Sequence, residues 1–498
     1  MPSEQRLHPA SILFSLGSLV RSFALPGILV VVGGSQGWWG WQSWLLWLAI
    51  PYSIVGIGRY FTFRYRYEPH EMVIRTGFVF RNERHIPYAR IQNLDGVQNV
   101  LHRLLGVVTV RVETGGGQEP EATMSVLPVA AFEEMRRRVF LGKEEAGEIA
   151  VSAPERALLQ LPPRELLLCG LIENRGFVVL AAVFGVVWEL GMFDRIMGQI
   201  FGEEEVSGRG LVRDLWRSLS GGSGFPVERI AIPLAAFLGF LLLIRLISMG
   251  WALVRLYGFR LSLAGEDLRT ELGLLTRVVA TIPLRRIQTL TIREGPLSRL
   301  FGRASVKVDT AGADGDEENK KQREWLAPII RRDELPGLVR AVLPGLDLVA
   351  VAWNAAPPRA FRRKLKQWLI VTLPIALPFV LLLEWWDLAL LPILFLWAFV
   401  GARQSVKHLG WAVTGDAVLF RSGWLWRQVS VARFAKIQAV AIHESPFDRR
   451  AAMARVRVDT AGAKDLAHRV DIPYLPRETA RELCDLLAMQ AARTAFRW

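Results

Sequence analysis

Cysteine is almost absent: Cys169 and Cys484 are the only two in 498 residues. A disulfide framework needs several paired cysteines at short spacings, so the small disulfide-rich class of secreted proteins is excluded. The 7 histidines show no His-Glu-x-x-His spacing, and neither cysteine has a partner at the spacing of a zinc site. We therefore expect reduced thiols in the cytoplasm, no metal site and no cofactor.

A phosphate-binding loop is also missing. Two segments, Val308–Ala313 and Val458–Ala463, resemble the Asp-x-x-Gly step of GTPases and the Asp-Thr-Gly of aspartic proteases. A GTPase also needs a Gly-x-x-x-x-Gly-Lys-Ser/Thr loop, which the sequence lacks, and the protease needs Gly directly after Thr, where both segments have Ala. We interpret both segments as turns after strands and predict that the protein is not an enzyme.

Apolar residues make up 51% of the chain, close to the roughly 45–50% of soluble proteins, so their clustering is more informative than their number. A bilayer span needs about 20 mostly apolar residues. Six stretches approach that length and fall into three pairs: Ser11–Val32 and Trp38–Tyr60, Gly176–Met192 and Ile230–Val254, and Leu365–Leu383 and Leu388–Val400. We predict six transmembrane helices arranged as three hairpins.

The net charge of +14 is concentrated beside these stretches. The flanking cations are Arg59, Arg64, Arg66, Arg255, Arg260, Arg359, Arg362, Arg363, Lys364, Lys366, Arg403 and Lys407, whereas the hairpin tips 33–37 and 384–387 contain no Lys or Arg. Cytoplasmic loops of membrane proteins carry this excess of positive residues. The pattern predicts a multi-pass protein of the plasma membrane with both termini and all three soluble segments in the cytoplasm, and it does not indicate nucleic-acid binding.

Three charged residues lie in or near the predicted spans: Arg21, Glu189 and Arg245. Charges inside a membrane are costly and are functional candidates by default. We expect Arg245 to be too deep to reach the membrane surface easily and to pair with Glu189 of the preceding helix.

The soluble segments are three copies of one unit. When Gly77, Gly273 and Gly423 are placed in register, the three segments align without a gap as far as Thr114, Thr310 and Thr460. The shared positions are a cation before Ile-Gln (Arg90 and Gln92, Arg286 and Gln288, Lys436 and Gln438), an Arg-x-x-Gly step (Arg103 and Gly106, Arg299 and Gly302), and a Val-acid-Thr end. The third copy keeps Arg449 but has Ala452 in place of the glycine.

Each copy has the pattern of a small β-domain. Residues 108–112, 305–308 and 455–458 alternate apolar and polar as half-buried strands do, and each aligned glycine lies between two short apolar runs, as in a hairpin turn. Each copy then ends with a strand that reaches a proline (Pro128, Pro328, Pro473) and an amphipathic stretch (Ala131–Phe140, Arg331–Val342, Arg477–Ala488). We expect that stretch to be a helix that caps the β-domain.

These motifs resemble the bacterial pleckstrin-homology-like (PH-like) domain family of the membrane-flanked type, the YdbS/YdbT group, in its triple-domain form. The resemblance covers essentially the whole chain and implies an α+β membrane protein. In it, each transmembrane hairpin is followed by a seven-stranded, strongly bent β-sandwich or barrel with a C-terminal helix. The resemblance also implies a companion membrane protein of the same family with a single hairpin and a single domain. It carries no agreed biochemical activity.

The predicted organisation places the hairpins at 1–62, 160–256 and 353–408 and the PH-like domains at 63–150, 257–350 and 409–498. The cations Arg90, Arg286 and Lys436 have two interpretations: contact with anionic headgroups, at about 1 kcal/mol per cation, or a solvated strand face on which Gln92, Gln288 and Gln438 pair with loop backbone. For Arg103, Arg299 and Arg449 a structural ion pair is at least as good an account as a lipid contact.

We expect a non-enzymatic membrane scaffold that presents three cytoplasmic domains to proteins or to the inner leaflet, in envelope defence or stress. Homo-oligomers are compatible with this expectation. The alternative is a lipid or peptide transporter whose six-helix bundle is gated by its cytoplasmic domains. A polar cavity among the spans would favour the transporter.

Overall fold

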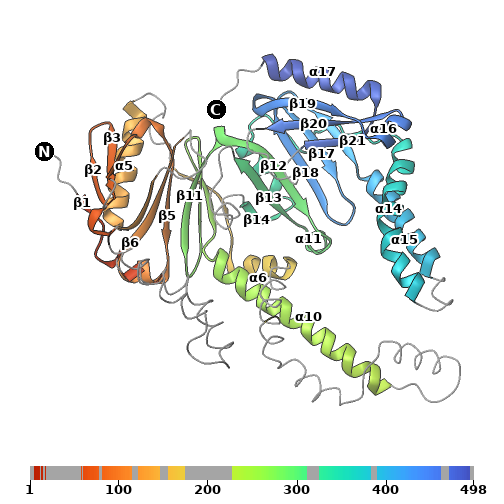
Figure 1. Ribbon diagram of the computed structural model, residues 1–498, viewed down its shortest axis with the longest axis horizontal. Helices are drawn as coiled ribbons and strands as arrows, with labels where there is room; N and C mark the ends of the chain where they lie inside the picture. The colour runs from red at the N-terminus through yellow and green to blue at the C-terminus, as the bar shows by residue number, and fades with distance from the viewer. Residues whose placement is uncertain are drawn as a thin grey trace, which may run out of the picture. The chain divides into compact units, whose positions relative to one another are not determined.

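The computed structural model describes residues 5–11, 13–14, 17, 58, 60–77, 81–114, 122–145, 155–173, 185, 227–310, 325–382, 390–460 and 470–493 (Figure 1). The chain divides into two compact units, one of residues 161–258 and one of the remainder. The larger unit contains the three copies of the β-domain.

Over the described residues each copy has seven strands and a C-terminal helix, as the resemblance implies. The first copy contains β1 (Gln5–Arg6), β2 (Arg64–Tyr67), β3 (Glu71–Thr76), β4 (Asn82–Pro87), β5 (Ile91–Gln98), β6 (Val107–Thr114), β7 (Ala122–Pro128) and α5 (Val129–Glu145). The second contains β8 (Arg156–Gln160), β9 (Arg260–Ala264), β10 (Asp267–Leu272), β11 (Arg277–Pro283), β12 (Ile287–Glu294), β13 (Arg303–Thr310), β14 (Trp325–Arg331) and α13 (Leu335–Val342). The third contains β15 (Asn354–Ala355), β16 (Gly410–Val413), β17 (Ala417–Ser422), β18 (Arg427–Arg433), β19 (Ile437–His443), β20 (Met453–Thr460), β21 (Val470–Pro476) and α17 (Arg477–Arg493).

The first strand of every copy precedes the predicted hairpin. β8 pairs with β9, although about 100 residues separate them, and β1 and β15 pair in the same way with β2 and β16. Each domain therefore begins before the boundary expected from the sequence, because β1 and β15 lie inside the ranges 1–62 and 353–408 and β8 ends at residue 160, the first of the range 160–256. The hairpin is inserted between the first and second strands.

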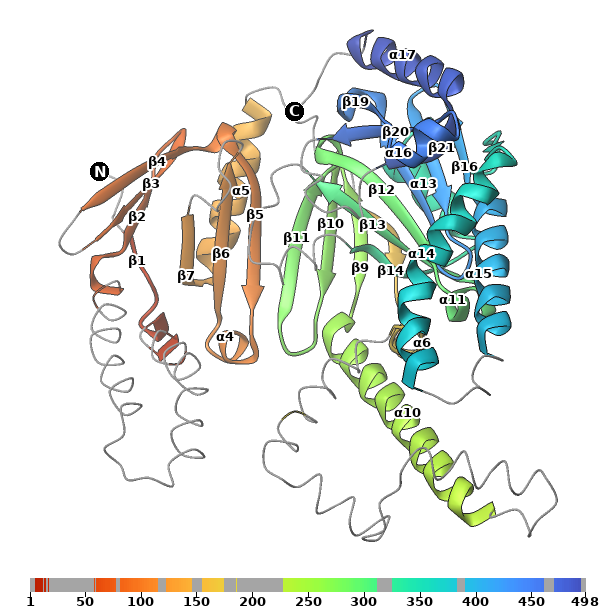
Figure 2. The same cartoon turned by 45° about the vertical axis from the view of Figure 1, so that its right-hand side comes forward.

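The sheets are shared between neighbouring copies. The strand orders are β1-β2-β3-β4, β7-β6-β5-β11-β10-β9-β8, β14-β13-β12-β18-β17-β16-β15 and β19-β20-β21, all antiparallel. Both seven-stranded sheets thus combine the last three strands of one copy with the first four of the next. Figure 2 shows β5 in orange beside β11 in green. Within a copy, the fourth strand leads to the fifth through a short 3-10 turn.

The core of each copy lies between its four-stranded half, its three-stranded half and its helix. In the first copy Tyr65 and Met72 from the four-stranded half meet Val110 from the other half and Met135 from α5. In the third copy Val418, Val456 and Leu483 make the equivalent core. The predicted alternation is visible in β20, where every second residue from Ala454 to Thr460 is buried. The three predicted capping helices are confirmed as α5, α13 and α17.

The three aligned glycines occupy the hairpin turns before the fourth strands, as the sequence predicts. Gly77, Gly273 and Gly423 have φ angles of 109°, 109° and 91°, a region that disfavours side chains. A Cβ at Gly273 would also lie 1.9 Å from the Thr276 carbonyl oxygen. Glycine is required there by both conformation and space.

Over its described residues the smaller unit contains α6 (Pro163–Ile172) and the long α10 (Val227–Leu256), with which α6 packs closely. A Cβ at Gly170 would lie 2.5 Å from the Met249 Cα, so glycine is needed for this approach. Within the described ranges, Leu238–Leu256 is the one helical stretch long and apolar enough to cross a membrane. Its apolar side chains are largely exposed, among them Leu242 at 61%.

Two further helices occupy the fifth and sixth predicted spans. They are α14 (Arg359–Leu382) and α15 (Leu390–Lys407), which pack together through the Phe361 and Phe399 rings at 5.3 Å. Neither meets the same length and hydropathy criteria over its described residues. The predicted spans Ser11–Val32, Trp38–Tyr60 and Gly176–Met192 lie almost entirely outside the described residues. A membrane-length helix is therefore present, and the full set of six stays a prediction.

Candidate interaction site at the joints between domains

Neighbouring copies are joined by strand pairing in one common register. In the first joint, β5 and β11, Gln98 lies opposite Arg277. The residues aligned with them, Glu294 and Arg427, lie opposite each other in the second joint, β12 and β18. The second joint has 6 residue pairs, from Thr289–Ala432 to Glu294–Arg427. Two copies of one sequence unit thus bind the next copy through the same edge.

The repeated arginine of the Arg-x-x-Gly step also crosses each joint. The Arg103 Nη1 donates a hydrogen bond to the Leu274 carbonyl at 3.0 Å, and the Arg299 Nη2 donates one to the Leu425 carbonyl at 2.8 Å. Both carbonyls belong to the glycine turn of the following copy. Each arginine thus makes a charged hydrogen bond to a backbone carbonyl of the next copy, whereas the sequence suggested a structural ion pair.

A third contact accompanies each arginine. In the first joint the Thr276 hydroxyl donates to the Asn99 side-chain oxygen at 3.0 Å. In the second joint the aligned positions are Trp426 and Gly295, and a Cβ at Gly295 would lie 3.6 Å from the indole ring. The polar pair of one joint is replaced by packing of a ring on a glycine in the other.

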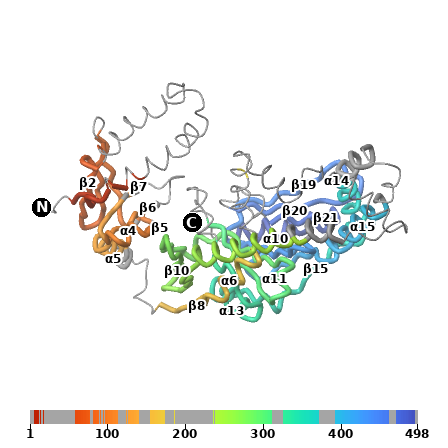
Figure 3. The backbone as a smooth tube through the Cα atoms, turned by 90° about the horizontal axis from the view of Figure 1, so that it is seen from below, coloured from red at the N-terminus to blue at the C-terminus, as the bar shows by residue number. Residues whose placement is uncertain are grey.

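The third copy carries the same elements without a following copy bound to them. In the part of the chain that the structure describes, β19 pairs with β20 alone. Figure 3 shows β19, β20 and β21 side by side. Glu444 is aligned with Glu294, and the exposed Arg449 is aligned with Arg103 and Arg299. Arg477 holds Glu444 through two hydrogen bonds of 2.8 and 2.7 Å, and these bonds hold the pKa of Glu444 below its ordinary value.

The cations before Ile-Gln end the 3-10 turns that connect the fourth and fifth strands. Arg90 is exposed, Arg286 is half-buried and Lys436 is only 4% exposed. Burial, followed by the nearby charges of Arg433 and Arg285, lowers the pKa of Lys436. The buried position of Lys436 is unsuited to contact with lipid headgroups, and none of the three lies on a strand face.

The glutamines that follow lie at a bulge in all three copies. The pairing with the sixth strand shifts at Gln92, Gln288 and Gln438 in the same way. The Gln288 amide donates to the Arg286 carbonyl at 3.3 Å, which is the predicted pairing with loop backbone. Gln438 is exposed. The Ile-Gln motif thus marks a conformational feature, since a bulge increases the local bend of the sheet.

The glycines of the Arg-x-x-Gly step have a conformational role. Gly106 and Gly302 have φ angles of 64° and 62°, and Ala452 adopts the same region at 52°. The third copy therefore bends as the others do, and alanine is accommodated in a left-handed conformation.

Arg245 reaches the C-terminal turn of α6. Its Nη1 donates to the Leu171 carbonyl at 3.0 Å, and one turn further along α10 the Ser248 hydroxyl donates to the Glu173 carbonyl at 2.7 Å. A cation is favoured at this end of a helix, where carbonyl groups lack partners. The other two predicted membrane charges, Arg21 and Glu189, lie outside the described residues, so the Arg245–Glu189 pair stays a prediction.

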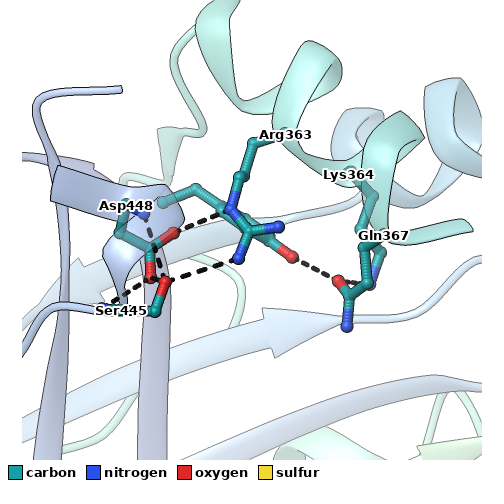
Figure 4. A network of polar contacts seen from close by, with 6 residues as sticks. Arg363, Lys364, Gln367, Ser445 and Asp448 are labelled. Atoms are coloured by element: carbon teal, nitrogen blue, oxygen red, sulfur yellow. Dashed lines mark hydrogen bonds and ion pairs between the residues drawn. The ribbon is translucent and has the colours of Figure 1, made fainter. Parts of the chain in front are cut away.

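A polar network fixes the third domain to α14 (Figure 4). The Arg363 Nε donates to Asp448 Oδ1 at 2.9 Å, and both side chains are largely buried. Asp448 also accepts from the Ser445 backbone N–H and closes a capping box at α16 (Pro446–Arg450). The Tyr474 hydroxyl donates to the Gln367 side-chain oxygen at 2.7 Å. One of the cations that the sequence places beside the membrane is thus an internal structural contact.

Burial raises the pKa of Asp448, but hydrogen bonds from Ser445 and Arg363 outweigh burial and hold the pKa below its ordinary value. The carboxylate is therefore ionised at neutral pH. Among the described residues no group of three or more His, Cys, Asp or Glu side chains could hold a metal ion.

Some site residues have no signal that could be found in the sequence alone. The strand edge and its register emerge only when the copies are placed together, and Asp448 has no counterpart in the other copies. Glu294 and Glu444 could have been found, since an acid recurs at this position in two of the three copies.

Comparison with known proteins agrees with the architecture. The bacterial PH domain family matches three segments, residues 12–141, 227–343 and 366–491. The UPF0699 transmembrane protein YdbT of Bacillus subtilis (strain 168) is 23% identical over 473 residues, which are 90% of this chain and 91% of that protein. No solved structure matches the chain. Because the three segments make up well over half of the sequence, the chain belongs to the bacterial PH domain family, with three copies of the domain.

Proposed function

We propose that this protein is a non-enzymatic scaffold of the plasma membrane that presents three PH-like domains in the cytoplasm to bind other proteins. The observation that carries the proposal is the repeated joint. The same strand edge binds a neighbouring domain twice within the chain, in one register and with the same arginine. A surface that binds a domain twice is a protein-binding surface in its own right.

The membrane anchor has support from the helix α10 and from the name of the B. subtilis relative, which calls that protein transmembrane. Anchoring confines the domains to a layer beside the bilayer and raises their effective concentration toward partners in the same membrane. Weak single contacts then add to a useful affinity.

The inner leaflet is a second surface within reach of the scaffold. Arg359, Arg362 and Lys366 are exposed at the start of α14. Each cation close to an anionic leaflet contributes about 1 kcal/mol of attraction. We assign these residues, rather than Lys436, to headgroup contact.

Affinity purification of the full chain from gently solubilised native membranes tests the scaffold. We expect a second protein to co-purify in stoichiometric amount. A chain that purifies alone with an ordered lipid or peptide bound among its helices would contradict the scaffold and favour the transporter.

A further inference from the structure

We propose that the outer edge of β19, together with Glu444 and Arg449, binds the fourth strand of a PH-like domain that belongs to a different protein chain. The inference rests on the proposed scaffold function and names the surface that the scaffold uses. The third copy would pair its strand with another protein as the first copy pairs with the second and the second with the third.

The backbone of β19 is open where its counterparts are covered. Gln438, Ala439, Ala441, Ile442 and His443 are all exposed, with Ile442 at 38%. The first six residues of the aligned strand β12, Ile287–Ile292, are buried. The difference lies in the neighbour, since β12 pairs with both β13 and β18 while β19 pairs with β20 alone in the described ranges. The helix α17 packs on β19 and contributes Leu483 and Leu487 to the domain core.

The side chains that complete a joint are present in the third copy. Glu444 directly follows β19 at the position aligned with Glu294, the last residue of β12, and Glu294 lies opposite the basic Arg427. The bond from Arg477 to Glu444 does not compete with docking, because the aligned Arg332 lies 3.6 Å from Glu294 within an occupied joint. Arg449 is exposed where Arg299 reaches the next glycine turn.

β4 of the first copy and β19 of the third copy are the strands at which a further copy could join, and they differ in their protection against strand pairing. Natural proteins blunt exposed edges with charged side chains, because an unpaired edge otherwise recruits other strands. β4 carries Glu83, Arg84 and His85, with the His85 imidazole 2.8 Å from Glu71. From Gln438 to Ile442, β19 carries no charged residue. The edge of β4 is therefore protected against strand pairing, whereas the edge of β19 is suited to it.

A comparison of β4 with β11 and β18 also indicates which kind of strand could pair with β19. In the second joint the residue in the middle of the fourth strand is the small, buried Ser430, opposite Thr291, and the residue aligned with it in β11 is the small, buried Ala280. The aligned residue of β4 is the exposed Arg84, and pairing at this position would take its charge out of water, which is costly. A second copy of this chain is therefore a poor fit. The fitting strand begins with a basic residue opposite Glu444 and continues with small and β-branched residues, as β11 and β18 do.

Photocrosslinking in native cells tests the assignment. The probe is the full chain with p-benzoylphenylalanine in place of His443, at the exposed end of the edge. We expect an adduct with a second protein whose sequence, identified by mass spectrometry, contains a bacterial PH domain. Ala441→Lys places a charge opposite the position of the small residue, and Arg449→Ala removes the contact with the turn. Each should reduce the adduct, Ala441→Lys at least about tenfold, whereas the matched change His85→Lys in β4 should leave it unchanged.

An adduct with a second copy of this chain, with a protein that lacks the domain, or no adduct at all overturns the assignment, and so does an adduct that Ala441→Lys leaves unchanged. Unchanged amide hydrogen exchange in β20 and β21 verifies that Ala441→Lys is folded, and Arg449→Ala supplies an independent test because it alters no strand. Co-purification distinguishes a failure of the proposed β19 surface from a failure of the proposed scaffold function. A partner that co-purifies equally with the wild type and with Ala441→Lys overturns only the β19 surface, whereas a wild type that purifies alone overturns the scaffold as well.

Discussion

Ala452 holds a backbone conformation that the other two copies give to glycine. Its φ of 52° lies in the left-handed region, where an L-residue with a Cβ is disfavoured by about 1–2 kcal/mol. At the aligned Gly302 a Cβ would meet nothing within 4 Å. The strain at this position is therefore one of backbone conformation rather than of crowding.

We predict that Ala452→Gly stabilises the third domain by about 1 kcal/mol, because glycine relieves this strain. Amide hydrogen exchange of β20 in the full chain should become about fivefold slower. The matched change Gly302→Ala should produce the reverse effect in β13, by a similar factor. Equal exchange in Ala452→Gly and the wild type would contradict the conformational account.

The sequence was most informative where a single residue type is required by conformation. The glycine turns and the Arg-x-x-Gly step were recognised because glycine recurs where φ must be positive. The role of Arg103 and Arg299 was not recognised, because their acceptors are backbone carbonyls of another copy and carbonyls leave no trace in the sequence. The burial of Lys436 was missed because it depends on segments distant in the sequence, with α17 against its 3-10 turn and Arg285 of the second copy nearby.

At the scale of the element, each joint combines a strand pairing with one arginine. Arg299 and Arg449 occupy the same place in their copies, but only Arg299 has a following turn within the described chain. Substituting Arg299 and Arg449 in turn therefore separates what the arginine contributes to a joint from what it contributes to its own domain.

We predict that Arg299→Ala weakens the second joint by about 1.5–3 kcal/mol, the range for hydrogen bonds to charged groups. Amide exchange in the paired strands β12 and β18 should accelerate by at least about tenfold. Arg449→Ala in the purified chain should change the exchange of β19 and β20 by less than about threefold, because exposed substitutions cost within about 0.5 kcal/mol. Similar acceleration by both changes would show that the arginine stabilises its own domain instead.

The helix α14 is attached to the third domain by the Arg363–Asp448 pair, at 2.9 Å. Asp448→Asn should destabilise this attachment by about 1–3 kcal/mol, since it removes the charge that faces a largely buried guanidinium. Amide exchange around α16 is the measurement.

The same contact should be lost in acid. The pKa of Asp448 is lower in the folded protein than its ordinary 3.8, so folding favours the ionised form. The stabilisation is complete above the ordinary pKa and disappears as the pH falls below 3.8 through the lowered value. The difference in exchange between the wild type and Asp448→Asn should therefore be large at pH 7 and shrink below about pH 4. A difference that persists unchanged at low pH would exclude the ionised carboxylate as its source.

Element prediction from the sequence succeeded for long periodic segments and failed for short ones. The alternating strands β6, β13 and β20 and the three terminal helices were recognised by their periodicity. β1 and β15 have 2 residues each, too few to show alternation, and their strand character depends wholly on the partner strand. The sequence therefore gives no sign of these two first strands.

At the scale of the whole molecule, strand pairing constrains the membrane topology. β8 pairs with β9, so both lie on one side of the membrane and the chain between them crosses an even number of times. The pairs β1–β2 and β15–β16 impose the same condition on the other two predicted hairpins. Because shared sheets join the three domains, all three belong on the same side. The distribution of Lys and Arg predicts that this side is the cytoplasm.

We predict that reporter fusions after Thr114, Thr310 and Thr460 all report a cytoplasmic location. The fusions follow the sixth strand of each copy, a position equivalent in all three domains. An enzyme active only in the periplasm and one active only in the cytoplasm serve as paired reporters. A single periplasmic result would contradict both the charge rule and the shared sheets.

The insertion of each hairpin inside a domain also sets an order of events during synthesis. β8 leaves the ribosome about 100 residues before β9, which corresponds to roughly 5–20 s at 5–20 residues per second. During that interval the nascent strand lacks its partner β9, and the predicted hairpin would enter the bilayer before the two strands meet. With the predicted topology, completion of the sheet would report successful membrane insertion, and a chain whose hairpin fails to insert would keep an open domain that chaperones and proteases can recognise.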